Sequence, residues 1–332
     1  MARTARDRWV NVALSAGGIA AGIAVGAALF SAPPPPETEG LGPYDGIYRT
    51  SDDPELGVEL IPDVNEHINA AGFFGRDYAL ETPDGTWRVV AIGDSVTMYH
   101  SAERLGYPSL LERTLPARVG RDVEILNLAV ASYETPQQVR SLRVRGLRYH
   151  PDFVVVGYCI NDGIDFVRLA HALGADAPLE RWADDRLDVH QRVRDAVLAS
   201  DELDWQRLFD EHIAPAGKWQ ESLAAFEALR ALADQHALAD QHELGVLVVL
   251  FPSLLELGDY FLAPAHRALS VQLARLGFGV LDLEPVFRDA GPVEALRTSP
   301  SDALHLSSTG HRAAATAIEE WLARHRPWER DR

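Results

Sequence analysis

Apolar residues gather in five short runs between residues 87 and 283, and each run is bounded by polar or turn-forming residues. Short runs that are mostly apolar are typical of strands that are buried on both faces of a parallel sheet. The pattern therefore predicts strands at residues 88–92, 123–127, 153–158, 246–251 and 279–283.

A helical period governs the stretches between and after these runs. It predicts helices at residues 108–119, 136–148, 218–242, 263–276 and 309–325. Regular alternation of strand and helix indicates an α/β domain, and its simplest assembly is a five-stranded, doubly wound parallel sheet sandwiched by helices. The connection at residues 163–217 is much longer than usual, so we expect an insertion that forms a lid or faces the substrate.

The start of the chain has a different composition. An uncharged, mostly apolar stretch at residues 10–30 follows a basic tail (residues 1–9) that contains Arg3, Arg6 and Arg8. A helix of this length spans roughly 31 Å, which matches the hydrocarbon thickness of a bilayer. Because basic residues stay on the cytoplasmic side, we expect a single-pass signal-anchor that leaves the main domain extracytoplasmic, in the periplasm or outside the cell.

A cleaved signal peptide, which would give a secreted protein, is the alternative. The best cleavage site has bulky Phe30 at its −3 position and Pro33 directly after the cut, and both disfavour cleavage. Gly18, Gly22 and Gly26 share one helix face with the spacing through which two membrane helices can pair. A homodimer is one interpretation of this spacing, and chance in a segment rich in Ala and Gly is the other.

Two further segments separate this stretch from the main domain. Residues 31–43 contain four consecutive prolines and predict a stiff linker. Residues 44–86 are rich in Gly, Pro, Asp and Asn, which predicts an irregular lead-in packed on the main domain at residues 87–326.

Composition narrows the choice of partners. Of 332 residues, 31 are Lys or Arg and 49 are Asp or Glu, which gives a net charge of −18. Nucleic acid is therefore not expected as a partner, because binding it requires cationic side chains that neutralise phosphates. The single cysteine, Cys159, excludes an internal disulfide and a cysteine-based zinc site. No metal-binding or nucleotide-binding motif occurs, so no metal and no cofactor is expected.

Four short polar blocks fall at the carboxyl ends of predicted strands, or in loops that can reach that edge. Ligands and catalytic groups collect there in open α/β sheets. The blocks are Gly93-Asp94-Ser95, NLAVASYET at residues 127–135 with Ser132, GYCIND at residues 157–162 with Asn161, and Asp302-Ala303-Leu304-His305.

In order, spacing and strand context, these blocks resemble those of the SGNH hydrolase superfamily, the GDSL-type esterases and lipases. The resemblance covers about residues 44–326, and the lead-in is similar to that of a membrane-anchored, exported bacterial branch. It implies a flavodoxin-like sheet order.

Roles for individual residues follow from the same resemblance. Ser95 is similar to the family nucleophile, His305 to its general base, and Asp302 to the residue that orients the imidazole. The oxyanion hole would consist of the backbone N–H groups of Ser95 and Ser132 and the side-chain amide of Asn161. A serine hydroxyl needs such a base to become nucleophilic, and the tetrahedral intermediate needs such donors.

The sequence departs from the family pattern at two places. Ser132 stands where the family has glycine, which matters if the turn requires a positive φ. Met98 and Tyr99 replace a later glycine of the first block and are expected to reshape the acyl pocket. The G-x-S-x-G elbow of α/β-hydrolases is absent because no glycine follows at position 97.

The sequence thus predicts a serine ester hydrolase that works through an acyl-Ser95 intermediate and removes O-acetyl or other acyl groups from cell-surface glycan or lipid. An O-acyltransferase that uses the same residues on a surface polysaccharide is the alternative. A non-catalytic glycan-binding or scaffold protein is a hypothesis from another class, and a retained base at His305 speaks against it.

Overall fold

The computed structural model describes residues 46–98, 100–101, 104–178, 181–240 and 244–329. The expected membrane segment at residues 10–30, with its glycines, lies outside these residues. Among the described residues, no helix is both long enough and apolar enough to cross a membrane. The chain divides into two units, residues 1–58 and 59–332.

In the first unit, the structure describes strand β1 (Tyr48–Thr50) and the turn that follows it. The backbone N–H of Ser51 closes this turn by donating to the carbonyl of Gly57 at 2.9 Å. Strand β2 (Val58–Leu60) begins at the last residue of the unit.

A five-stranded parallel sheet forms the centre of the second unit, and every predicted strand is present with nearly the expected ends. Its strands are β3 (Trp87–Gly93), β6 (Val123–Asn127), β7 (Phe153–Cys159), β8 (Gly245–Phe251) and β9 (Gly279–Asp282). Their order is β6-β3-β7-β8-β9, the flavodoxin-like order. All residues of β3, β6 and β7 are buried, which explains why most of their residues are apolar.

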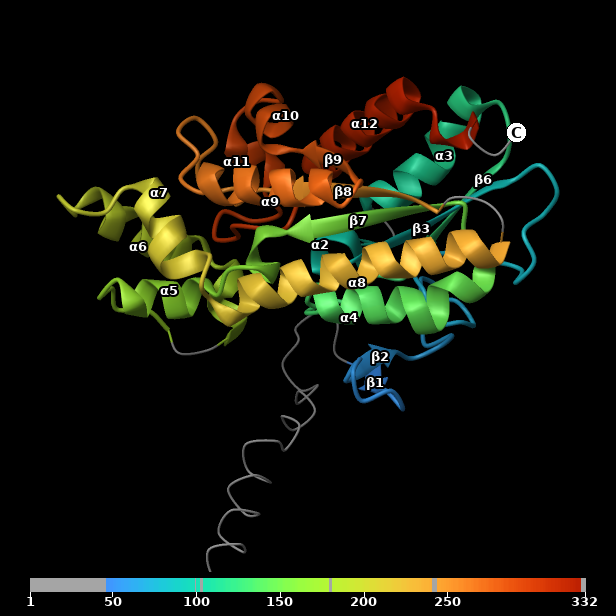
Figure 1. Cartoon of the computed structure of the whole chain (residues 1–332), viewed down its shortest axis with the longest axis horizontal. Coiled ribbons are helices and arrows are strands. Elements are labelled where there is room, and N and C mark those ends of the chain that lie inside the picture. The colour runs from blue at the N-terminus through green and yellow to red at the C-terminus, as the bar shows by residue number, and fades with distance from the viewer. Residues whose placement is uncertain (1–45, 99, 102–103, 179–180, 241–243, 330–332) are drawn as a thin grey trace, which may run out of the picture. The chain divides into compact units, whose positions relative to one another are not determined.

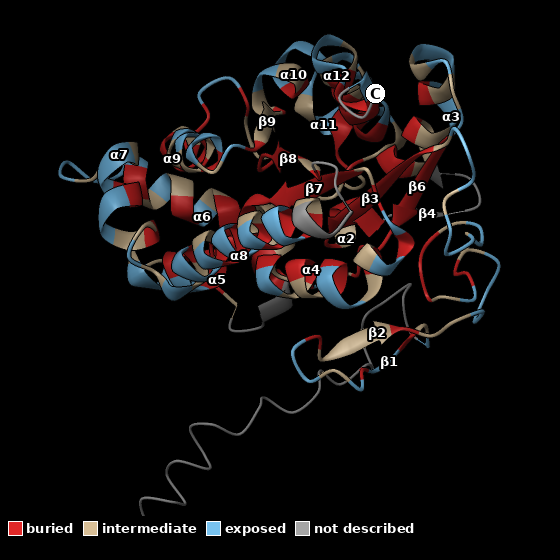
Figure 2. Ribbon diagram, turned by 45° about the vertical axis from the view of Figure 1, so that its right-hand side comes forward, coloured by how far each residue is buried: buried red, intermediate tan, exposed pale blue. Residues whose placement is uncertain are grey.

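Helices cover both faces of the sheet (Figure 1). On one face α3 (Tyr107–Val119) packs against α12 (Ser308–His325), and on the other α4 (Thr135–Ser141) packs against α8 (Gly217–Asp240). Figure 2 shows the buried sheet between helices whose outer sides are exposed. The expected sandwich is therefore confirmed.

Not every predicted helix is regular. The segment predicted as one helix at residues 136–148 ends as an α-helix at Ser141 and continues as a π-turn, η2 (Leu142–Gly146), and a 3₁₀ turn, η3 (Leu147–Tyr149). The hydrophobic period does not distinguish these forms. The remaining elements are α2 (Ser95–Met98), β4 (His100–Ser101), β5 (Arg104–Leu105), α9 (Ala263–Arg275), α10 (Glu284–Asp289), α11 (Val293–Leu296) and η7 (Pro327–Glu329).

The long connection between β7 and α8 is largely helical. It holds η4 (Ile160–Asp162), α5 (Phe166–Ala172), η5 (Arg181–Asp185), α6 (Leu187–Leu198), α7 (Trp205–Leu208) and η6 (Phe209–Ile213). In Figure 1 helices α5 to α7 lie beyond the arrowhead of β7. The backbone N–H of Ala303 donates to the carbonyl of Asp185 at 2.7 Å. The connection therefore reaches the loop that contains Asp302 and His305.

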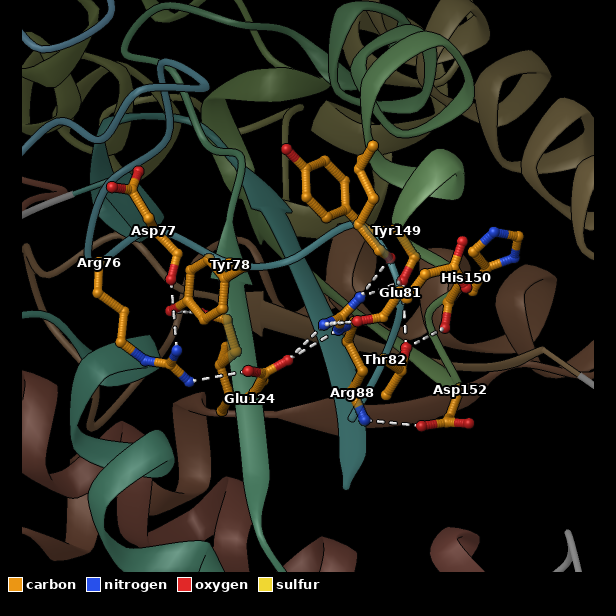
Figure 3. Close-up of polar contacts among 12 residues, drawn as sticks. Arg76, Asp77, Tyr78, Glu81, Thr82, Arg88, Glu124, Tyr149, His150 and Asp152 are labelled. Atoms are coloured by element: carbon orange, nitrogen blue, oxygen red, sulfur yellow. Dashed lines mark hydrogen bonds and ion pairs between the residues drawn. The ribbon is translucent and has the colours of Figure 1, made fainter. Parts of the chain in front are cut away.

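A buried arginine of β3 links the segment before this strand to the neighbouring strand β6 (Figure 3). Arg88 is fully buried, and its guanidinium donates to Glu124 at 2.6 and 2.9 Å. It also donates to the carbonyls of Leu80 at 2.9 Å and Tyr149 at 2.7 Å. A buried charge is tolerated only when it is paired in this way. This network stands at the start of β3, so it leaves the carboxyl end free for chemistry.

Candidate active site

Ser95 lies directly beyond β3, as the first residue of α2. Because β3 stands between β6 and β7, the chain leaves the sheet in opposite directions on its two sides. Ligand sites of doubly wound sheets form at this switch point. The fold thus presents the Ser95 hydroxyl at the position where this architecture binds its ligands.

The glycine before Ser95 is required for space. Gly93 does not have a positive φ. A Cβ atom at Gly93 would instead lie 2.1 Å from the Thr97 hydroxyl oxygen, and one at Gly157 on the next strand would meet the same atom at 2.1 Å. The two glycines therefore allow the first turn of α2 to settle directly on the strand ends.

Ser95, His305 and Asp302 form one hydrogen-bonded chain. The Nε2 atom of His305 lies 2.8 Å from Ser95 Oγ, and its Nδ1 lies 2.9 Å from Asp302 Oδ2. An ionised carboxylate only accepts hydrogen bonds, so Nδ1 carries the proton and Nε2 is free to accept one. The arrangement gives the serine hydroxyl a base in the required tautomer.

The loop that bears the histidine owes its shape to Asp302. Its Oδ1 accepts hydrogen bonds from the backbone N–H groups of Leu304 at 2.9 Å and His305 at 2.8 Å. Such a turn is typical of aspartate. One carboxylate therefore folds the loop with one oxygen and orients the imidazole with the other.

The electrostatics of this pair favour charge separation. Burial tends to lower the pKa of His305, but the hydrogen bond and charge of Asp302, with the charges of Asp185 and Asp94, outweigh burial and raise it. Burial likewise tends to raise the pKa of Asp302, and the hydrogen bond and charge of His305 outweigh that effect and lower it. The imidazolium that forms when Ser95 loses its proton is thus stabilised in advance.

A second carboxylate faces the same histidine, and sequence analysis missed it. Asp185 Oδ2 lies 4.0 Å from His305 Nδ1. Burial raises the pKa of Asp185, the charge of Asp302 adds to this, and His305 opposes it. Asp185 comes from the long connection, in an acidic stretch that no motif distinguishes, so only the fold brings it to the site.

Ser132 lies in the loop after β6, next to the end of β3. The preceding Val130 donates its N–H to the carbonyl of Gly93 at 3.3 Å, which holds this loop along β3. Ser132 has φ 65°, in the left-handed region that favours glycine. The turn therefore does require a positive φ.

Met98, expected to reshape the acyl pocket, is buried with its sulfur 3.1 Å from the backbone N–H of Ala131.

Asn161 lies in η4, directly after β7 and on the other side of β3 from Ser132. Its Oδ1 atom is buried and has no hydrogen-bond partner within the described part of the chain. The neighbouring Asp162 accepts hydrogen bonds from Thr135 Oγ1 at 2.9 Å and Gln138 Nε2 at 2.8 Å. Asp162 thus links the Asn161 turn to α4, which follows the Ser132 loop.

Asp94 is buried beside the nucleophile. Its Oδ1 accepts the backbone N–H of Val96 at 2.9 Å, which shapes the turn around Ser95. Burial raises the pKa of Asp94 to about 6, against the opposing effects of the Val96 N–H, His305 and Lys218. Asp94 therefore supports the Ser95 turn from its buried side. Among the described residues, no group of three or more His, Cys, Asp or Glu side chains is arranged to hold a metal ion.

A serine, a histidine and an aspartate joined in this order are the constellation of serine hydrolases, here on a doubly wound sheet. The chain matches the model of the GDSL-like Lipase/Acylhydrolase family over residues 91–313. It therefore belongs to this family, and it is an SGNH-type esterase. No curated protein sequence matches the chain.

Several solved structures are similar at low identity. An acetylxylan esterase from Geobacillus stearothermophilus is 15% identical, with 70% of this chain and 93% of that chain covered and a TM-score of 0.44. A lipase/acylhydrolase from Enterococcus faecalis is 15% identical, with 72% and 96% covered and a TM-score of 0.43. An alpha/beta hydrolase enzyme from the metagenome of Lake Arreo is 18% identical, with 70% and 93% covered and a TM-score of 0.44.

Proposed function

We propose that this esterase removes O-acetyl or other acyl groups from cell-surface glycan or lipid through an acyl-Ser95 intermediate. The observation that carries the proposal is the chain of short contacts from Ser95 Oγ to His305 Nε2 (2.8 Å) and from His305 Nδ1 to Asp302 Oδ2 (2.9 Å). A binding protein has no need of a base held in this tautomer.

Each step of the reaction uses a group already described. His305 takes the proton of Ser95 as Oγ attacks the ester carbonyl, and the imidazolium is stabilised by Asp302. The oxyanion accepts hydrogen bonds from the backbone N–H groups of Ser95 and Ser132 and from the Asn161 amide. His305 then protonates the leaving alcohol, and water, activated by the same base, releases the acid from Ser95.

Replacing the nucleophile tests the chemistry. Ser95→Ala should abolish hydrolysis of p-nitrophenyl acetate and labelling by a fluorophosphonate probe, with an unchanged circular dichroism spectrum. Ser200→Ala, on the exposed surface of the long connection, is the matched control and should behave as the wild type. Full turnover in Ser95→Ala would disprove the proposal.

Substrate class requires its own experiment. A panel of acyl esters of increasing chain length measures the acyl preference, and O-acetylated polysaccharide measures activity on glycan. Adding a deacetylated polysaccharide as acceptor separates hydrolysis from acyl transfer. A hydrolase releases acetate at the same rate with and without the acceptor, whereas an O-acyltransferase forms a new glycan ester. A scaffold protein would show neither product.

The location of the enzyme is a further part of the proposal. The apolar residues 10–30 and the basic tail before them support a retained, single-pass anchor with the catalytic domain outside the cytoplasm. Full-length protein should remain in membranes after carbonate extraction. A mature N-terminus at Pro33 or beyond would instead indicate secretion after cleavage. Crosslinking of wild type and Gly22→Ile in membranes tests the homodimer, because a bulky side chain should block close helix pairing.

A further inference from the structure

The basic residues of the chain are almost all arginine. Of its 31 Lys and Arg residues, Lys218 is the one lysine, and all the others are arginine. A lysine ammonium is a compact charge with three donors, whereas a guanidinium is planar and wider. A position that keeps lysine in such a chain is a candidate for a site where the smaller cation is needed.

Lys218 is also unusual in where it stands. It is the second residue of α8, and its side chain is 18% exposed. The first turn of a helix disfavours positive charge because the backbone N–H groups there carry partial positive charge. Local preference therefore opposes this cation, and tertiary contacts must hold it in place.

Those contacts reach three segments around the candidate active site. The ammonium donates to the backbone carbonyl of Asn161 at 2.6 Å. It also lies 3.5 Å from Glu134 Oε1 and 3.8 Å from Asp184 Oδ2. Asn161 carries the side-chain donor of the proposed oxyanion hole. Glu134 follows Ser132 by two residues, and Asp184 directly precedes Asp185.

The charge of Lys218 also affects two buried carboxylates next to the site. It opposes the rise in pKa that burial causes at both Asp94 and Asp162. These carboxylates flank Ser95 and Asn161 in the sequence. The positive charge of Lys218 therefore favours the ionised form of both carboxylates.

We propose that Lys218 is a positioning residue of the oxyanion hole, which fixes the Asn161 turn and the start of α4 by a single ammonium. This inference rests on the proposed function, since it assigns Lys218 to the oxyanion donors of that site. A guanidinium is planar and wider than an ammonium, so we expect an arginine to reproduce the contacts with one carbonyl and two carboxylates only in part.

Two substitutions at Lys218 test the inference, with kcat expressed per active site titrated by a fluorophosphonate. Lys218→Met should lower kcat on p-nitrophenyl acetate by roughly 10–100-fold with little change in KM, because it weakens donors that act mainly in the transition state. Affinity for a trifluoromethyl ketone, which forms a tetrahedral adduct on the serine, should fall by a similar factor. Lys218→Arg keeps the charge and should recover only part of the loss.

Arg207→Met is the matched control, because it removes one exposed cation from the connection that precedes α8, and it should leave kcat, KM and inhibitor affinity unchanged. Wild-type kcat and inhibitor affinity in Lys218→Met would overturn the inference, and so would a rise in KM alone. If Lys218→Met does not fold, Lys218→Arg decides, and full wild-type kcat in it contradicts the inference. Failure of the proposed function would be recognised separately. In that case the fluorophosphonate would label Ser95→Ala as strongly as the wild type.

Discussion

Two loops from distant parts of the chain each present a carboxylate to His305, and they do so differently. Asp302 lies 2.9 Å from Nδ1 and is 14% exposed. Asp185 lies 4.0 Å from the same atom and is 40% exposed. The pKa of Asp302 is lowered, by the hydrogen bond and charge of His305 against burial, whereas the pKa of Asp185 is raised, chiefly by burial.

This difference shows that the two carboxylates contribute in different ways, one by orienting His305 and the other by its charge. Asp302 fixes the orientation of the imidazole, because one of its oxygens holds the loop backbone and the other contacts the ring. Asp185 makes no short contact with the ring and acts on His305 through its charge. We therefore expect Asp302 to determine whether catalysis occurs and Asp185 to determine the pH range in which it occurs.

The largest effect is expected at Asp302. Asp302→Asn should lower kcat/KM by ~10³–10⁴-fold, because an amide can hydrogen-bond the wrong imidazole tautomer. Steady-state kinetics on p-nitrophenyl acetate measure the loss, and circular dichroism checks the fold. A loss no larger than that of Asp185→Asn would remove the distinction between the two carboxylates.

An oxyanion donor should behave unlike either carboxylate. Asn161→Ala should lower kcat by roughly 10²–10³-fold with little change in KM, because the amide binds charge that exists only in the transition state. The acid limb of the pH profile should stay in place, since His305 keeps both of its carboxylates. A shifted limb would show that Asn161 acts through the histidine.

At Asp185 the expected effect is a shift in pH dependence. The groups that face His305 are Asp302, Asp185, Asp94 and His311. The negative charge of Asp185 raises the pKa of His305, and catalysis needs the neutral imidazole. Asp185→Asn should therefore move the acid limb of kcat/KM to lower pH while the plateau changes by less than about fivefold.

Asp188→Asn is the control for that experiment. Asp188 is a nearby carboxylate that pairs with Arg186 at 2.8 Å, so the variant removes the same charge without facing His305. Its acid limb should coincide with that of the wild type. An identical shift in both variants would show that overall charge, and not the placement of Asp185, sets the pKa of His305.

Ser132 should give the smallest effect. Ser132→Gly removes a side chain from a left-handed position, so the free energy of unfolding should rise by up to about 1 kcal/mol. The backbone N–H is kept, and kcat should stay within about twofold of the wild type. Urea unfolding and steady-state kinetics measure the two quantities. A large loss of kcat would indicate that the hydroxyl of Ser132 itself donates to the oxyanion.

The features that depend on local sequence pattern could be predicted from the sequence. The strands were predictable because they are buried on both faces. The same pattern placed Ser95, Ser132 and Asn161 after strand ends, whereas their catalytic roles were assigned from the resemblance to the SGNH family. The Asp302 and His305 pair is close in sequence, so its spacing was visible. These assignments needed no knowledge of how distant segments pack.

Other features depend on tertiary contacts that no local pattern contains. Asp185 reaches His305 because the long connection is hydrogen-bonded to the loop at Ala303. Lys218 opposes the local preference of its helix and is held by Asn161, Glu134 and Asp184. Groups that tune a site from another segment are therefore the part that sequence analysis missed.

The central claim is that Ser95 carries the acyl group, and one measurement tests it directly. The enzyme is quenched in acid during turnover of p-nitrophenyl acetate, digested, and analysed by mass spectrometry. We predict one acetyl group on the peptide that contains Ser95, and it should form more slowly in Asn161→Ala, because acylation passes through the same oxyanion. An unmodified Ser95 during turnover, or acetyl on another residue, would contradict the account.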